Sequence, residues 1–429
     1  MNVLIIGSGG REHTLAWKIK QSPLCNRLYV LSGNAGTEEI AENLDISFSE
    51  HDKLKKFVID KDINLLVVGP EAPLVEGIRD NFEADPDLQE IMFIGPGREG
   101  AMIEGSKDFA KQFMRKHRIP TADSFTFTPD QLSEAKVHIR KIPVPIVVKA
   151  DGLAAGKGVI ICQTREEAEQ AIDNMLVRGV FGKAGSKIVI EEYLKGIELS
   201  VFLLTDGKNY VIFPEAKDYK RIGENDTGPN TGGMGSVSPV IFADPSFMQK
   251  VEERIIQPTI RGLSNDGIKY IGFIFLGLMN VNGDPFVIEY NVRMGDPESQ
   301  VVIPRIKNDF VKLLTAASKG ELNQHRINVN RDTAVTVVLA SGGYPGSYEK
   351  GKVIKGLDRV QNAIVFHAGT KTDGSSQTVT QGGRVLALTG LGRDLKDALK
   401  ITYSEINKIQ WEGMQYRKDI GQDLLKLEK

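Results

Sequence analysis

The first hundred residues contain four short apolar runs, each followed by a segment rich in glycine, proline or polar residues. The runs are Val3–Ile6, Leu28–Leu31, Leu65–Val68 and Met92–Ile94. Because they are apolar throughout and are separated by segments long enough to cross a sheet, they predict parallel strands that are covered by helices on both faces. Ligands in such folds bind beyond the carboxyl ends of the strands. We therefore expect an open parallel α/β domain over residues 1–103, with a binding site at that edge.

The segments that follow these runs are expected to meet at one edge of the sheet; they are residues 7–13, 32–37, 69–73 and 95–97. In the first segment, Gly9 and Gly10 favour an anion at the N-terminus of a helix, where free N–H groups and the helix dipole attract negative charge. A plain tight turn is the alternative. A nicotinamide nucleotide is disfavoured, because Glu12 stands where its fingerprint requires a third glycine and no acidic residue directly follows the second run.

Composition excludes several classes of protein. The chain has 429 residues, of which 41% are hydrophobic and 26% charged, as in a globular protein of roughly three domains and unlike a disordered chain, a collagen or a coiled coil. A formal net charge of −2 argues against a protein that coats nucleic acid or anionic lipid. Cys25 and Cys162 fit no zinc-binding or disulfide pattern, and no apolar run approaches the ~18 residues that cross a membrane. We expect a soluble cytoplasmic protein without nucleic-acid or membrane partners.

The middle region of the chain is expected to span residues 104–325, and a predicted helix over 101–118 leads into it. A compact unit follows at 121–192, with three strands, a glycine loop and a helix near 165–177. Longer strands are predicted at Ile197–Leu204, Tyr210–Glu215, Ile271–Asn280 and Pro285–Asn291, before a helix that follows Asp309. Residues 326–429 are expected to form a small C-terminal α+β domain behind a polar linker, 325–332. Its predicted elements are strands at Ala334–Ala340, Ala363–His367 and Arg384–Thr389 and a helix from Asp394.

The glycine loop of the compact unit reads Lys149-Ala-Asp-Gly-Leu-Ala-Ala-Gly-Lys-Gly158. It differs from a P-loop, because the spacing from Gly152 to Gly156 is one residue short, Gly158 replaces the hydroxyl residue, and a strand follows instead of a helix. A flexible hairpin that folds over nucleotide phosphates, with Lys149 and Lys157 supplying positive charge, fits better. The alternative is a solvated hairpin tip.

Two strand ends carry acidic or amide side chains. After the apolar run 188–190, Glu191 and Glu192 precede Glu198, which suits an adenine edge and ribose hydroxyls; an exposed acidic strand end is the alternative. Glu289, Asn291 and Arg293 are spaced by two and therefore share one face of a strand. Carboxylate and amide oxygens suit Mg²⁺ that bridges phosphates, and Arg293 suits a carboxylate or phosphate. The alternative here is a cross-strand ion pair.

Residues 218–236, which we call the polar loop, contain five glycines within 223–235 and almost no apolar side chains. A loop of this length and composition inside a compact region is functional or disordered. Asp218, Lys220 and Arg221 at its start favour a small polar substrate. Phosphate-binding loops, lysines, a Mg²⁺ pair and a polar loop together describe phosphoryl transfer from ATP by positioning and electrostatics.

Several motifs, in their order along the chain, resemble the phosphoribosylamine–glycine ligases (glycinamide ribonucleotide synthetases), which are ATP-grasp enzymes of purine synthesis. They are Gly-x-Gly-Gly-Arg-Glu-His from Gly7, Gly-Pro-Glu-Ala-Pro-Leu from Gly69, the glycine loop, Asp-Thr-Gly-Pro-Asn-Thr-Gly-Gly-Met-Gly from Asp226, and Gly-Asp-Pro-Glu from Gly295. The resemblance covers essentially the whole chain. It implies an N-terminal α/β domain, a central ATP-grasp region whose residues 121–192 form a mobile lid, and a small C-terminal domain.

The resemblance also implies a reaction in which ATP, glycine and 5-phosphoribosylamine give glycinamide ribonucleotide, ADP and phosphate through glycyl phosphate. It implies ATP contacts at Lys107, Lys149, Gly152, Gly156, Lys157, Gly158, Glu191, Glu192, Leu194 and Glu198, and Mg²⁺ or Mn²⁺ at Glu289 and Asn291. The resemblance implies four catalytic residues that orient the substrates: Asp218, Lys220, Arg293 and Asp296. It implies substrate contacts at Asp218, Arg293, Asp296, Gly9, Gly10, Pro70 and Glu71. We expect a monomer that contacts the preceding enzyme of the pathway transiently.

The chain departs from the family at a few positions. Tyr219 stands where histidine is frequent, Ser8 where asparagine is common and Met294 where phenylalanine is common. Another ATP-grasp carboxylate–amine ligase and a non-catalytic nucleotide sensor are the rival hypotheses. The polar loop argues against both, and the Glu289–Asn291 pair argues against the sensor.

Overall fold

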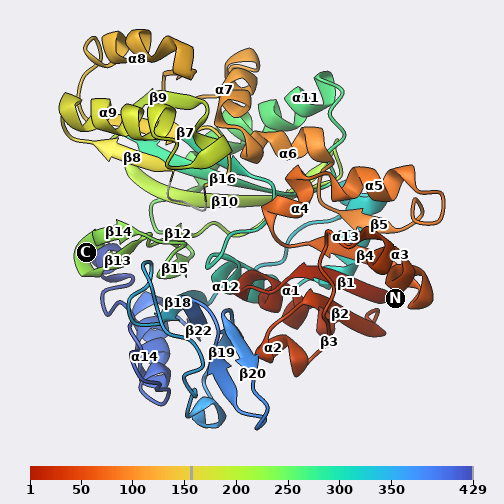
Figure 1. Ribbon diagram of the computed structural model, residues 1–429. Helices are drawn as coiled ribbons and strands as arrows, with labels where there is room; N and C mark the ends of the chain where they lie inside the picture. Colours follow the sequence, from red (N-terminus) through yellow and green to blue (C-terminus); the bar gives the residue numbers. More distant parts are fainter. Residues whose placement is uncertain (155–157, 428–429) are drawn as a thin grey trace.

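The computed structural model describes residues 1–154 and 158–427 (Figure 1). Its N-terminal part is a parallel sheet in the order β3-β2-β1-β4-β5, and all neighbouring strands in it run parallel. The strands are β1 (Asn2–Gly7), β2 (Arg27–Ser32), β3 (Glu42–Leu44), β4 (Ile63–Val68) and β5 (Met92–Ile94). The four predicted strands are confirmed. Pattern reading missed β3, because this short edge strand, Glu-Asn-Leu, has no apolar run.

Both faces of this sheet are buried, as the continuous apolar runs predict. Leu4 and Ile6 of β1 belong to one hydrophobic core, whereas Val3 and Ile5 belong to another on the opposite face. The strand order reverses around β1, between β2 and β4, so the ends of β1 and β4 lie at a topological switch point. The helices of this part are α1 (Gly10–Lys20), α2 (Ala35–Glu38), α3 (His51–Asp60), α4 (Glu71–Val75) and α5 (Ile78–Ala84).

The central region is built on an antiparallel sheet in the order β11-β10-β16-β17, and it shares both cores with the N-terminal part. The strands are β10 (Ile197–Thr205), β11 (Tyr210–Ile212), β16 (Gly272–Val281) and β17 (Asp284–Asn291). Helices α10 (Pro245–Val251) and α11 (Gln257–Asn265), which were not predicted, cover one face, and α13 (Phe310–Lys319) covers the other. The helix expected over 101–118 is two helices, α6 (Arg98–Gly105) and α7 (Lys107–Lys116), because extended Ser106 interrupts it and caps α7.

The lid, residues 121–192, has a core of its own and lies above the central sheet (Figure 1). Its sheet has the order β6-β9-β7-β8, and β6 was missed because it mixes polar and apolar residues. The elements are β6 (Ser124–Phe127), α8 (Leu132–Ile139), β7 (Ile146–Ala150), β8 (Val159–Cys162), α9 (Arg165–Ile172) and β9 (Ile188–Glu192). The two helices pack on one face of the sheet, which leaves the face that carries Lys149 and Glu191 toward β17.

The C-terminal sheet is not made from the last hundred residues alone. Its order is β12-β15-β18-β22-β19, and β12 (Lys217–Asp218) and β15 (Gly235–Ser238) come from the two ends of the polar loop. The remaining elements are β18 (Thr333–Ala340), β19 (Ala363–His367), β20 (Thr370–Thr372), β21 (Thr378–Thr380), β22 (Arg384–Gly392), α14 (Leu395–Ile406) and α15 (Gln422–Leu427). The sheet therefore crosses the division expected at 325/326. The linker also bonds back to the central region, because Asn330 N donates to Arg305 O at 2.6 Å.

The polar loop is ordered in the structure. Between β12 and β15 it forms a two-stranded ribbon of β13 (Arg221–Gly223) and β14 (Thr227–Asn230). Arg417 from the C-terminal part reaches this ribbon, where Nη1 contacts Asp226 Oδ1 at 2.7 Å. The disordered alternative therefore does not apply. Across the part of the chain that the structure describes, none of the helices has the length and apolar character needed to span a membrane.

Tyr219, which stands where histidine is frequent in the family, is buried in the core of the C-terminal part. Its hydroxyl donates to Asp423 Oδ1 at 2.6 Å and accepts from Gly421 N at 3.0 Å. Lys217 Nζ lies 3.7 Å from the centre of its ring. The side chain of Tyr219 thus ties β12 to the start of α15.

We predict that Tyr219→Phe lowers the free energy of unfolding by about 1–3 kcal/mol, because Asp423 and the Gly421 amide both lose a partner. Urea unfolding followed by the fluorescence of Trp411, which lies in the same core, measures this change. Tyr348→Phe is the matched control, since Tyr348 is half-buried and lies outside this core. Equal stability of the two variants would contradict the role assigned to Tyr219.

Candidate active site

The lid and the central sheet meet at a group of lysines and carboxylates. Lys149 on β7 places Nζ 3.3 Å from Ile288 O on β17 and 2.9 Å from Glu191 Oε1 on β9. The second contact is an ion pair without the alignment of a hydrogen bond. Lys107, the first residue of α7, donates to Gly152 O at 3.2 Å. The structure thus brings Lys107, Lys149 and Gly152 together, as the proposed phosphate contacts require, while Gly156 and Lys157 lie outside the described residues.

Electrostatics tie this group to β17. Burial would raise the pKa of Glu289, but Lys220, Lys149 and Lys107 outweigh it and hold that pKa below its ordinary value. Burial lowers the pKa of Lys107, and the charge of Glu289 opposes this shift. Glu289 is therefore a carboxylate at neutral pH, and lysines surround it. An anionic ligand beside it would interact favourably with these lysines.

Glu289 and Asn291 lie on one face of β17, because they pair with Gly277 and Phe275 of β16. Neither partner is charged, so the cross-strand ion pair considered as an alternative is absent at these two positions. Asn291 is buried, and its Nδ2 has no hydrogen-bond partner. Arg293 was expected on the same face; β17 ends at Asn291, so Arg293 lies beyond the strand, although its charge still helps to lower the pKa of Glu289.

The two residues fit a hard divalent cation. A carboxylate and an amide that is not held by other protein groups are oxygen ligands of the kind that Mg²⁺ takes. No group of three or more His, Cys, Asp or Glu side chains in the described part of the chain could hold a metal ion. A cation at Glu289 and Asn291 would therefore take its other ligands from phosphate and water, which is usual for Mg²⁺ with a nucleotide.

Glu191 has a buried side chain that lies between two lysines. Its Oε2 is 3.1 Å from Lys111 Nζ, opposite the contact with Lys149. Lys111 also donates to Thr121 Oγ1 at 2.8 Å and Ala122 O at 3.1 Å, where the chain enters the lid. Through Glu191 the same ammonium group contacts β9, the strand from which the chain leaves the lid. Burial lowers the pKa of Lys111 to about 8. Sequence reasoning missed Lys111; its signal was a place one helical turn after Lys107.

The other expected nucleotide contacts lie at the exit from β9. Glu192 is exposed, and its Oε1 accepts from Asp123 N at 3.0 Å. Leu194 is half-buried, and Glu198 forms an ion pair with Lys220. A ribose hydroxyl at Glu198 would therefore share the carboxylate with Lys220. Gly158, at the other end of the glycine loop, accepts from Ala150 N at 2.8 Å.

Asp218 and Glu298 are two partly or fully buried carboxyl groups beside Lys220. Burial raises the pKa of Asp218, although Lys220 opposes the shift. Burial also raises the pKa of Glu298, and the nearby charge of Asp218 adds to it. Glu298 accepts from Ser200 Oγ at 3.3 Å. Sequence reasoning missed Glu298, although the Gly-Asp-Pro-Glu motif that contains it was the available signal.

Arg293 lies between two carboxylates. Its Nε is 3.3 Å from Glu71 Oε2, and its Nη2 is 3.0 Å from Glu104 Oε1. Glu104 also accepts from Val292 N at 2.7 Å, and burial raises its pKa to about 7. The structure thus brings Arg293 and Glu71 together as expected and adds Glu104, which nothing in the sequence marked. A substrate carboxylate on Arg293 would exchange with one of these partners.

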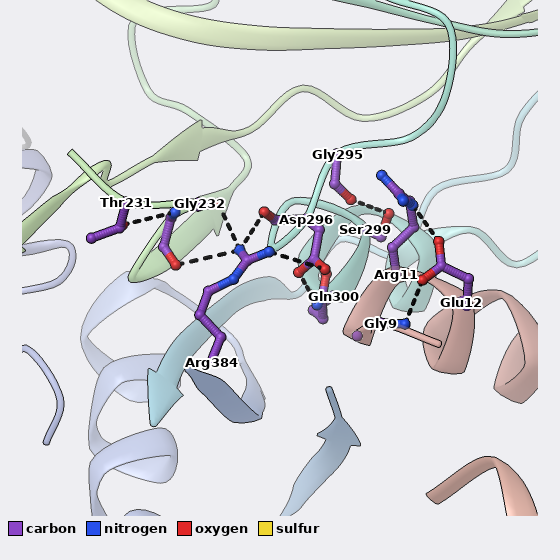
Figure 2. Close-up of polar contacts among 12 residues, drawn as sticks. Gly9, Arg11, Glu12, Thr231, Gly232, Gly295, Asp296, Ser299, Gln300 and Arg384 are labelled. Atoms are coloured by element: carbon purple, nitrogen blue, oxygen red, sulfur yellow. Dashed lines mark hydrogen bonds and ion pairs between the residues drawn. The ribbon is translucent and has the colours of Figure 1, made fainter. Parts of the chain in front are cut away.

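The N-terminus of α1 meets Asp296 at a junction of the three parts of the chain (Figure 2). Gly9 N donates to Glu12 Oε2 at 2.6 Å, and Gln300 Nε2 donates to Asp296 Oδ1 at 2.9 Å. A Cβ on Gly10 would lie 2.5 Å from Gln300 Nε2, so a larger residue there would displace the Gln300 side chain from Asp296. The anions at this helix N-terminus are therefore carboxylates of the chain itself. Pro70, the N-cap of α4, borders the same edge of the sheet.

The other two departures from the family pattern act here through backbone atoms. Ser8 O accepts from Asn34 Nδ2 at 2.9 Å, and Met294 O accepts from Arg11 Nη1 at 3.2 Å. The Met294 side chain is buried in the core behind the site. These two contacts come from carbonyl groups, which any residue at either position supplies.

Comparisons with known proteins agree with this geometry. Residues 1–104, 105–299 and 334–423 match the N, ATP-grasp (A) and C domains of phosphoribosylglycinamide synthetase. Phosphoribosylamine–glycine ligases of Yersinia pestis and Vibrio cholerae are 46% and 47% identical to the chain over 426 residues, which make up 98% of this chain and of each relative.

Solved structures give the same result. The chain superposes on the phosphoribosylamine–glycine ligase of Thermotoga maritima with a TM-score of 0.84 and 36% identity, over 98% of this chain and all of the other. The biotin carboxylase domain of Hydrogenobacter thermophilus 2-oxoglutarate carboxylase, at 17% identity and a TM-score of 0.72 over 96% of this chain and 91% of the other, shares the fold. The matched domains and the full-length relatives show that the chain belongs to the phosphoribosylglycinamide synthetase family of ATP-grasp ligases.

Proposed function

We propose that the protein joins glycine to 5-phosphoribosylamine in an ATP-dependent reaction that yields glycinamide ribonucleotide, ADP and phosphate, a step of de novo purine biosynthesis. The observation that carries this proposal is full-length similarity to ligases of that name, together with Lys107, Lys149, Glu289, Asn291 and Arg293 gathered at one site. Each of these residues has the charge or the oxygen atoms that phosphoryl transfer requires.

The reaction is proposed to run in two steps. A carboxylate oxygen of glycine attacks the γ-phosphorus of ATP, and the bond from that phosphorus to the β,γ-bridging oxygen breaks to release ADP. The amine nitrogen of phosphoribosylamine then attacks the carbonyl carbon of glycyl phosphate. The carbon–oxygen bond to phosphate breaks, and the nitrogen loses a proton as the amide forms.

The residues of the chain act mainly by position and charge. Lys107 and Lys149 neutralise the phosphates from the lid side, and the Gly152–Gly158 segment covers them. Glu191, Glu192 and Leu194 frame the adenine with backbone groups, and Glu198 accepts from the ribose. Glu289 and Asn291 would hold Mg²⁺ or Mn²⁺, which would neutralise the negative charge of the phosphates during transfer.

The proposed site for glycine and the ribosylamine lies between the polar loop and the edge of the N-terminal sheet where β1 and β4 end. Arg293 binds the glycine carboxylate, whose approach displaces Glu71 or Glu104 from the guanidinium group. Asp218 and Lys220, with Asp296, orient glycine and the ribosylamine. Gly9, Gly10 and the Pro70–Glu71 segment border the ribosylamine on the other side.

We further propose that the enzyme works as a monomer in the cytoplasm and that it contacts the preceding enzyme of the pathway transiently. Family membership supports the small-molecule substrates. Light scattering after size exclusion tests the monomer. Activity titrations with Mg²⁺ and Mn²⁺ test which ion is used.

ADP release in the presence of Mg²⁺, ATP and glycine tests the reaction, with and without phosphoribosylamine made in situ from ribose 5-phosphate and ammonia. We expect release that requires both substrates and a product with the mass of glycinamide ribonucleotide. Tight ATP binding without release under these conditions would refute the proposed substrates and leave the ATP-grasp fold intact.

We predict that Glu289→Gln lowers kcat by about 100-fold while the Kd for ATP changes little, because charge neutralisation matters most as the phosphoryl group transfers. Stopped-time ADP assays and equilibrium ATP binding measure the two quantities. Glu90→Gln, at an exposed position, is the matched control. Near-normal turnover of Glu289→Gln at limiting Mg²⁺ would show that the metal ligand is misassigned.

We also predict that ATP with Mg²⁺ slows amide exchange in β7 and β8 of the lid, because the glycine loop excludes water only when it covers the nucleotide. Exchange followed by mass spectrometry measures this protection. The C-terminal strands β18 and β22 serve as the internal control, since they lie outside the lid. Unchanged exchange in β7 and β8 would argue against closure.

A further inference from the structure

Arg384, the first residue of β22, reaches from the C-terminal sheet into the junction beside Asp296 (Figure 2). Its Nη1 donates to Gly232 O and Asp296 O, each at 2.6 Å, and its Nη2 lies 3.3 Å from Asp296 Oδ2. One guanidinium group therefore binds the polar loop and both the main chain and the side chain of Asp296. A planar fork of donors makes such a set of contacts, and a single ammonium group does not.

The same loop peptide is held a second time from the C-terminal part. Gly232 N donates to Tyr344 Oη at 3.0 Å, so both backbone groups of Gly232 bind C-terminal side chains. The glycine pair permits this approach. A Cβ on Gly232 would lie 2.9 Å from Arg384 Cζ, and a Cβ on Gly233 would lie 2.4 Å from Pro297 Cδ. Gly233 also has a φ of +112°, which favours glycine.

We propose that Arg384 is a positioning residue for the ligation reaction: it fixes the Gly232–Gly233 segment of the polar loop against Asp296, with Tyr344 as its second anchor. This inference rests on the proposed function, because it takes Asp296 and the polar loop as the groups that orient the substrates. Arg384 acts through them and touches no substrate in the proposed arrangement. The C-terminal part thereby contributes to the geometry of a site formed by the other two parts.

Charge supports the same role. Burial would raise the pKa of Asp296, but Arg384 and, to a lesser extent, Arg11 hold it below its ordinary value. Arg384 is thus the largest favourable charge on Asp296, while Gln300 bonds the other carboxylate oxygen. Without Arg384, Asp296 would keep Gln300 and Arg11 but lose the group that links it to Gly232.

The test compares Arg384→Gln and Arg384→Lys with the wild-type chain, in steady-state kinetics and in amide exchange of residues 228–235. We expect Arg384→Gln to lower kcat/KM for phosphoribosylamine or glycine by about 10- to 100-fold at an unchanged KM for ATP, because a small misplacement of orienting groups costs this much. Exchange in 228–235 should accelerate. Arg384→Lys should recover part of the loss, since it keeps the charge on Asp296 but not the fork.

Arg393→Gln is the matched control, because Arg393 is 89% exposed in its side chain and pairs only with Asp397 within the described residues. Tyr344→Phe tests the second anchor and should accelerate exchange of the same segment if Arg384→Gln does not fold. Unchanged exchange in 228–235, or a fall in kcat that only follows a loss of folded protein with all KM values unchanged, would overturn the proposal. If the wild-type chain fails to make glycinamide ribonucleotide, the proposed function fails, while the exchange measurement still decides whether Arg384 holds the loop.

Discussion

The candidate site depends on lysines and carboxylates that the fold buries close to one another. Lys107, Lys149 and Lys220 surround Glu289 and keep it ionised despite its burial. Lys149 and Lys220 also pair with Glu191 and Glu198, so positive and negative groups are interspersed here. The lysines can interact with the phosphates of ATP and the carboxylate with a divalent cation, which is why the arrangement suits ATP.

The lid is connected to these groups by one buried carboxylate. Glu191 contacts Lys149, a proposed phosphate contact, and also Lys111, which holds the chain entering the lid. Glu191 and Lys149 lie on the neighbouring lid strands β9 and β7, so a movement of the lid would carry both away from Lys111 and from β17. In the proposed function, nucleotide binding at Lys149 would depend on lid position through these contacts.

Much of the fold was predictable from the sequence, and the exceptions have physical causes. Continuous apolar runs identified β1, β2, β4 and β5, because strands buried on both faces admit few polar residues. The short edge strand β3 and the mixed strand β6 have one open edge and lack that pattern. Among the site residues, Glu289 and Asn291 were readable from their spacing. Arg384 and Glu104 were not, because their partners lie far away in the chain.

The side chain of Tyr219 points away from the candidate site, although the residue lies within a motif of that site. The sequence Asp-Tyr-Lys-Arg places it between Asp218 and Lys220, two proposed substrate residues. Tyr219 follows directly after β12 and lies in the C-terminal core, where it contacts Asp423 and Lys217. A residue within a functional motif can therefore serve the fold alone. The strand β12 then has two roles: its one face fixes the C-terminal part, and its other face presents Asp218 to the site. The strand β15, at the other end of the polar loop, pairs with β12 and with β18 in the same sheet. The pairing register of the C-terminal sheet therefore fixes both ends of the polar loop.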